Sequence, residues 1–185
     1  MALRPVLALT CLMLSACVGT QPTLHLMDPP SAARHLPDRL GRVEVRDVSL
    51  PQYAKAPEIT LQAADGSLKS YPNQLWADAP AAAITRILAE QISDQSGATA
   101  IAEPWPMSQG PDRRLDVRIT RLYAGADGRM HVAGRYFVTP AGAGGRDLTR
   151  RFDIAVPLAS ENADGVSRAQ AKALTELAAQ IAQLK

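Results

Sequence analysis

The chain has 185 residues, in which 20 Lys and Arg face 18 Asp and Glu, so its formal net charge is +2. This length is enough for one domain with a sizeable apolar core. The near balance of charge excludes both the strongly basic surface of a nucleic-acid-binding protein and a polyacidic tail. The only cysteines are Cys11 and Cys17, so no disulfide framework or cysteine metal site is predicted for the rest of the chain.

Residues 1–16 have the layout of a secretory signal peptide, which the letters that follow mark as that of a lipoprotein. Arg4 precedes an apolar run over 6–14, which is shorter than the roughly 20 residues of a membrane-spanning helix. The letters L-S-A-C at 14–17 resemble the bacterial lipobox, [LVI]-[AST]-[GA]-C. The resemblance implies cleavage before Cys17 and attachment of a diacylglycerol and an N-linked acyl chain to it. The alternative is an ordinary cleaved signal peptide with a chance cysteine near the cut.

The residues after the lipobox predict the membrane to which the protein is sorted and the way in which the lipid is connected to the folded domain. Val18 is not aspartate, which by analogy with enteric bacteria favours the outer membrane, on its periplasmic face. Residues 17–39 are rich in proline and are predicted to form an extended tether between the lipid and the fold. His25 and His35 lie in this segment and are interpreted as solvated. The folded domain is expected over residues 40–185.

Short strands and one helix are predicted for the first part of this domain. Alternation of apolar and polar residues indicates strands at 42–50, 58–61 and 68–71. The apolar stripe over 81–96 has helical spacing. Asp78 is expected to cap the start of this helix, and Gly97 is expected to end it.

The second part of the domain is predicted to be a meander followed by a helix. A short strand at 98–102 precedes longer alternating segments at 114–123, 130–138 and 148–156. The last helix, over 165–184, has alanines beside its apolar stripe, which lets another element approach closely. The sequence therefore predicts an α+β two-layer sandwich, with a mostly antiparallel sheet and two long helices packed on one face.

Motifs of enzymes and metal centres are missing from the sequence. It has no G-x-S-x-G elbow, P-loop, G-x-G-x-x-G or H-E-x-x-H. His131 is the only histidine of residues 40–185 and falls on the polar face of a predicted strand. We therefore predict no catalytic residue, no metal ligand, and no cofactor besides the lipid on Cys17. A periplasmic hydrolase would need a serine hydroxyl within hydrogen-bond reach of His131.

Arginines and tryptophans leave two further alternatives open. The arginines of the meander are Arg114, Arg118, Arg121, Arg135, Arg150 and Arg151. They form either a basic strip that faces anionic lipid or an acidic partner, or the solvated side of the sheet, which is the preferred interpretation. Trp76 and Trp105 lie beside prolines and are either core plugs or interface anchors, since tryptophan is favoured in interface hot spots.

The order of these segments resembles one family of lipoproteins. Residues 48–60, V-S-L-P-Q-Y-A-K-A-P-E-I-T, are similar to the V-x-x-P-x-Y-L-D-R-P-x-I-V stretch of the PqiC/YmbA-like auxiliary lipoproteins of ABC-type transport systems. Residues 75–80, L-W-A-D-A-P, resemble that family's R-W-A-E-P-L segment. Trp105-Pro106, the meander and the alanine-rich helix follow in the same order. Ala54-Lys55-Ala56 and Gln74 depart from the family's charged residues, so a partner contact made by those charges would differ here.

This resemblance implies a non-catalytic subunit of a lipid transport system that contributes to envelope integrity. Its partners would be an MCE-domain periplasmic protein and that protein's inner-membrane partner, with the membrane reached through the lipid anchor. A homo-oligomeric ring is one form that the docked subunit could take. The residues expected to face the partner are Pro51, Tyr53, Pro57, Trp76 and Trp105. The alternative is a lipoprotein that itself binds a lipid or peptide in a pocket between sheet and helices.

Overall fold

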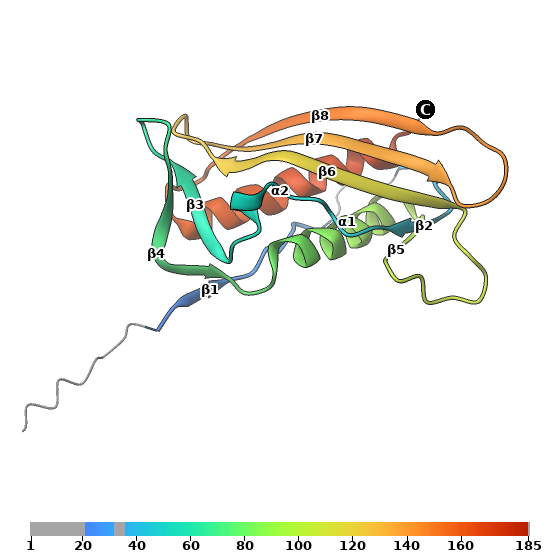
Figure 1. The fold of residues 1–185 in the computed structure, drawn as a ribbon, viewed down its shortest axis with the longest axis horizontal. Helices are drawn as coiled ribbons and strands as arrows, with labels where there is room; N and C mark the ends of the chain where they lie inside the picture. Colours follow the sequence, from blue (N-terminus) through green and yellow to red (C-terminus); the bar gives the residue numbers. More distant parts are fainter. Residues whose placement is uncertain (1–20, 32–35, 185) are drawn as a thin grey trace, which may run out of the picture.

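The computed structural model describes residues 21–31 and 36–184, and each predicted strand and helix is present in it (Figure 1). A strand at Thr23–His25 was not predicted. The elements in chain order are β1 (Thr23–His25), β2 (Arg42–Val45), the 3-10 turn η1 (Gln52–Ala54), β3 (Glu58–Gln62), β4 (Leu68–Trp76), α1 (Pro80–Ser96), β5 (Thr99–Ala102), β6 (Arg113–Ala124), β7 (Arg129–Pro140), β8 (Leu148–Pro157) and α2 (Ala163–Ala182).

The strands form one eight-stranded sheet with β6 near its centre. On one side, β6, β7 and β8 make the predicted antiparallel meander, and these are the longest pairings of the sheet. On the other side, β2 pairs in parallel with the first part of β6, and β3 pairs in parallel with its end. The short pairings β1–β4 and β2–β5 are also parallel. The sheet is thus mostly antiparallel by length, and it does not close into a barrel.

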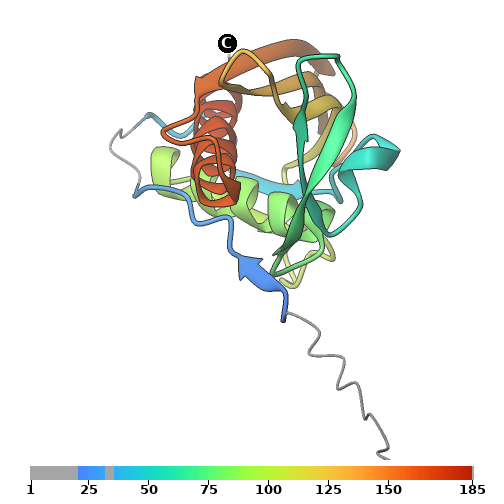
Figure 2. The same cartoon turned by 90° about the vertical axis from the view of Figure 1, so that its left-hand side faces the viewer.

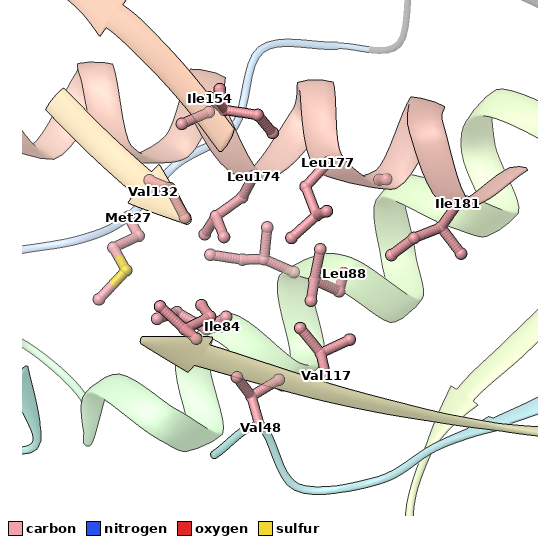
Figure 3. Packing of buried hydrophobic residues seen from close by; sticks show 14 of the residues in the cluster. Met27, Val48, Ile84, Leu88, Val117, Val132, Ile154, Leu174, Leu177 and Ile181 are labelled. Atoms are coloured by element: carbon pink, nitrogen blue, oxygen red, sulfur yellow. The ribbon is translucent and has the colours of Figure 1, made fainter. Parts of the chain in front are cut away.

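Both helices pack on the same face of this sheet, which confirms the predicted two-layer arrangement. Figure 2 looks nearly along α2 and shows the sheet curving around the two helices. In α1 the apolar stripe is fully buried, and in α2 the buried alanines leave room for close packing against α1. Figure 3 shows side chains of the helices meeting those of the strands, among them Leu88, Leu174 and Val117. Full burial of each such side chain stabilises the fold by about 1.5–3 kcal/mol.

The C-terminal cap of α1 is the predicted one, but the N-terminal cap is not. Gly97 is the C-cap with a φ of 72°, a left-handed conformation that favours glycine. The predicted N-cap, Asp78, is wrong, because Ala79 occupies the cap position and makes no side-chain hydrogen bond. Asp78 lies one residue too early, and its carboxylate accepts a hydrogen bond from the Ala79 N–H at 2.8 Å.

The described part of the proline-rich segment packs on the domain, unlike the extended tether expected over residues 17–39. β1 pairs with β4, and His25, expected in solvent, lies 2.5 Å from the Gln74 side-chain oxygen. Met27 is only 6 % exposed and accepts a hydrogen bond at its sulfur from Gln170 of α2. The Leu36 N–H donates to the carbonyl of Gln95 at the end of α1. Apolar burial and the free edge of β4 explain why these residues join the fold before residue 40.

Candidate functional site

The loop between β2 and β3 carries most of the residues expected to face a partner. Pro51 has φ −62° and ψ 152°, and η1 begins directly after it. The Ala54 N–H donates to the Pro51 carbonyl at 2.9 Å, which closes the turn. Pro51 and Tyr53 are half-buried, whereas Pro57 is exposed. The loop is therefore a defined turn on the surface beside β3.

Tyr53 fills a gap in the hydrogen bonding of the sheet. Along one edge of β6, the Ile119 N–H donates to the Ser49 carbonyl, and further on Ala124 pairs with Leu61 of β3. Between these two points the Leu122 N–H donates to the Tyr53 hydroxyl at 3.1 Å. The phenol thus supplies the acceptor that a neighbouring strand would otherwise offer. This contact gives Tyr53 a structural task that the sequence did not reveal.

Trp76 lies next to this loop and is bonded to it through its backbone. Its backbone N–H donates to the Pro57 carbonyl at 2.7 Å, and its half-buried ring packs against the core. Together with residues of η1, β6, β7 and α2, it lines a cavity of about 20 Å³. That volume is about the space of one water molecule. Such a cavity holds no lipid chain or peptide, so this part of the interface between sheet and helices is filled.

Trp105 lies apart from the other four expected contact residues. It belongs to the segment between β5 and β6, which Figure 1 shows at the opposite end of the molecule from β3 and β4. Its backbone N–H donates to a Glu44 carboxylate oxygen at 3.2 Å, and its indole N–H donates to the Gln109 carbonyl at 2.8 Å. The structure therefore brings Pro51, Tyr53, Pro57 and Trp76 into one region and leaves Trp105 in another.

The polar contacts of His131 are made with Asp127, in the turn between β6 and β7. Its ring nitrogen Nε2 lies 3.0 Å from both carboxylate oxygens of Asp127, and its ring lies 5.4 Å from that of Tyr123. The hydrogen bond with His131 lowers the pKa of Asp127 below its usual value. Within the described ranges, no serine hydroxyl bonds to His131, so the pair that a serine hydrolase would need is not assembled there.

Residues 21–31 and 36–184 contain neither a candidate metal site nor a membrane-spanning helix. In these residues no three His, Cys, Asp or Glu side chains gather in a way that could hold a metal ion. None of the helices found there has the length and apolarity needed to cross a membrane. Cys17, the expected site of lipid attachment, lies outside the described residues.

Register in the meander gives the arginines an arrangement that their sequence spacing did not reveal. Arg118, Arg135 and Arg151 face one another across β6, β7 and β8. Arg150 pairs with the buried Tyr136 and so lies at a register position of the opposite face. Alternation within each strand had placed these residues on faces, but only the pairing between strands brings three of them together.

Comparisons with known proteins agree with this fold. No curated protein matches the sequence significantly. A crystal structure of an uncharacterised protein is similar over 89 % of this chain and 98 % of its own, with a TM-score of 0.71 and 19 % identity. Protein XCC0632 from Xanthomonas campestris is similar over 86 % of this chain and 92 % of its own, with a TM-score of 0.66 and 18 % identity. The family model of the ABC-type transport auxiliary lipoprotein component matches residues 23–182. The chain belongs to this family of transport auxiliary lipoproteins.

Proposed function

We propose that this chain is a non-catalytic auxiliary subunit of an ABC-type lipid transport system that contains an MCE-domain protein. The observation that carries the proposal is the family match over residues 23–182, which begins six residues after the last position of the L-S-A-C lipobox at 14–17. Lipid on Cys17 holds the domain at the periplasmic face of the outer membrane. The partners are the MCE-domain periplasmic protein and its inner-membrane partner, and the assembly contributes to envelope integrity.

The proposed mechanism is to hold a partner at the membrane surface. Each buried CH₂ of an acyl chain contributes about 0.8 kcal/mol, so two or more chains make a durable anchor. Anchoring raises the effective concentration of the domain at the membrane, so modest contacts are enough for docking. The small cavity near Trp76 favours docking over storage of a lipid between sheet and helices. Several anchored copies arranged in a ring would strengthen docking further.

The docking surface that we propose is the loop from Pro51 to Pro57. Gln52, Lys55 and Pro57 are exposed beside η1, and the contacts of Tyr53 and Trp76 hold this loop in place. Trp105 would make a separate contact at the other end of the domain. Replacing Lys55→Glu is expected to weaken recovery of the partner in a pull-down, whereas Lys172→Glu, on the exposed face of α2, is a matched control. Equal recovery with both variants would contradict this surface.

Metabolic labelling with radioactive palmitate tests the anchor. The wild-type protein and a Cys11→Ser variant are expected to carry the label and to fractionate with the outer membrane, because Cys11 leaves with the signal peptide. Cys17→Ser is expected to lose the label. A labelled Cys17→Ser protein, or an unlabelled wild type, would contradict the proposed lipoprotein.

A further inference from the structure

A row of three arginines crosses the outer face of the meander. Arg118 of β6 is directly opposite Arg135 of β7, and Arg135 is directly opposite Arg151 of β8. Like charges directly opposite each other on neighbouring strands destabilise a sheet. This juxtaposition does not stabilise the fold. It is explained if the row binds an anionic ligand that offsets the repulsion among the arginines.

Carboxylates on the same face neutralise only part of this charge. Asp116 pairs with Arg118 at 2.8 Å, and Asp153 pairs with the neighbouring Arg121 at 2.8 Å. Arg135 and Arg151 are both exposed and form no ion pair with the residues that the structure describes. The positive charge left without a counter-ion is therefore concentrated in two neighbouring guanidinium groups.

The same face is hollowed where these arginines lie. A trough of about 660 Å³ lies on this face. Its lining includes the apolar residues Ala133 and Phe137 and four arginines, namely Arg118, Arg121, Arg135 and Arg151. The Arg118 guanidinium carbon lies 5.0 Å from the centre of the Phe137 ring, which keeps that arginine at the wall of the trough. The volume is within the range of small-molecule binding sites. The trough thus combines a concentrated positive charge with an apolar lining.

We propose that this trough binds the headgroup of an anionic phospholipid, with Arg135 and Arg151 donating hydrogen bonds to its phosphate. The planar donor fork of a guanidinium matches phosphate oxygens two at a time. Unpaired charge on only two adjacent residues suits one phosphate group better than a long acidic polypeptide. The apolar lining at Ala133 and Phe137 suits the glycerol backbone and the first carbons of the acyl chains. This site goes beyond the proposed docking role and does not depend on the identity of the partner.

Calorimetric titration of the full chain with a water-soluble lipid tests the site. The probes are dihexanoyl phosphatidylglycerol, dihexanoyl phosphatidylcholine and inorganic phosphate. We expect the phosphatidylglycerol to bind at least about tenfold more tightly than either of the others, because only it combines net negative charge with apolar chains. The double variant R135Q/R151Q is expected to weaken its binding about tenfold or more. The control R86Q/R168Q removes the same charge from the exposed helix faces and should bind as the wild type does.

Several results would overturn this inference. Inorganic phosphate that binds as tightly as the phosphatidylglycerol would mean a free-phosphate site. Phosphatidylcholine that binds as tightly as the phosphatidylglycerol would mean that the trough does not recognise the net negative charge of the headgroup. Equal losses in the two double variants would mean a general effect of net charge. Hexaglutamate, titrated as a fourth probe, would identify an acidic polypeptide as the ligand if it bound more tightly than the phosphatidylglycerol. Thermal unfolding separates binding from folding, because R135Q/R151Q relieves like-charge contacts and should melt at or above the wild-type temperature. A lower melting temperature would mean that these arginines support the fold.

Discussion

Replacing Tyr53 with phenylalanine removes one hydroxyl group and is expected to lower the free energy of unfolding by about 1–2 kcal/mol. The hydroxyl is the acceptor for the Leu122 N–H at 3.1 Å, and Leu122 is only 5 % exposed. A buried N–H left without an acceptor costs about 1–3 kcal/mol. The lower part of that range applies because Tyr53 is half-buried, so water can reach part of the vacated position. For a domain of this size, the melting temperature should fall by roughly 2–8 °C.

Urea unfolding followed by circular dichroism measures this change directly. Tyr123→Phe is the matched control, because the Tyr123 side chain is also half-buried but its hydroxyl forms no hydrogen bond with the described part of the chain. The control should change the free energy of unfolding by less than about 0.5 kcal/mol. If Tyr53→Phe were as stable as Tyr123→Phe, the structural role of Tyr53 would be refuted. The Tyr53 ring would then be free to act as the partner contact that the sequence suggested.

Three further changes test other parts of the fold. Met27→Ala should cost about 2–5 kcal/mol because the side chain is buried, whereas the neighbouring Leu26→Ala, 68 % exposed, should cost little in the same urea titration. Gly97→Ala should cost about 1 kcal/mol from backbone strain alone, since a Cβ there meets no atom within 4 Å; an unchanged melting temperature would contradict the left-handed cap. Hydrogen bonds from Arg42 lower the pKa of Asp112 to about 2 from 3.8, so the ionised carboxylate stabilises the fold above pH 3.8. Asp112→Asn should therefore be less stable than the wild type at pH 7, and the difference should shrink as the pH falls towards 2; a constant difference would contradict this.

Local patterns predicted the helices and the meander correctly, because both depend on periodicity within one segment. The buried stripe of α1 and the alternation in β6 can be read from consecutive residues. The position of Gly97 was predictable for the same reason. The cap at Asp78 was not, since one residue of displacement decides whether a carboxylate reaches the free N–H groups of the first turn.

Features that depend on distant segments could not be predicted in this way. β1 exists only because β4 offers an edge, and Met27 is buried only because α2 lies beneath it. The hydroxyl of Tyr53 bonds to an amide 69 residues further along the chain. The arginine row likewise arises from register between strands, which alternation within a strand does not define.

Affinity purification of the lipidated full-length protein from membranes, with identification of the chains that copurify, tests the proposed function most directly. We predict that an MCE-domain protein is recovered with the wild type, together with its inner-membrane partner, and that recovery falls for Cys17→Ser because the domain is no longer concentrated at the membrane. A wild-type eluate without any MCE-domain protein would contradict the account.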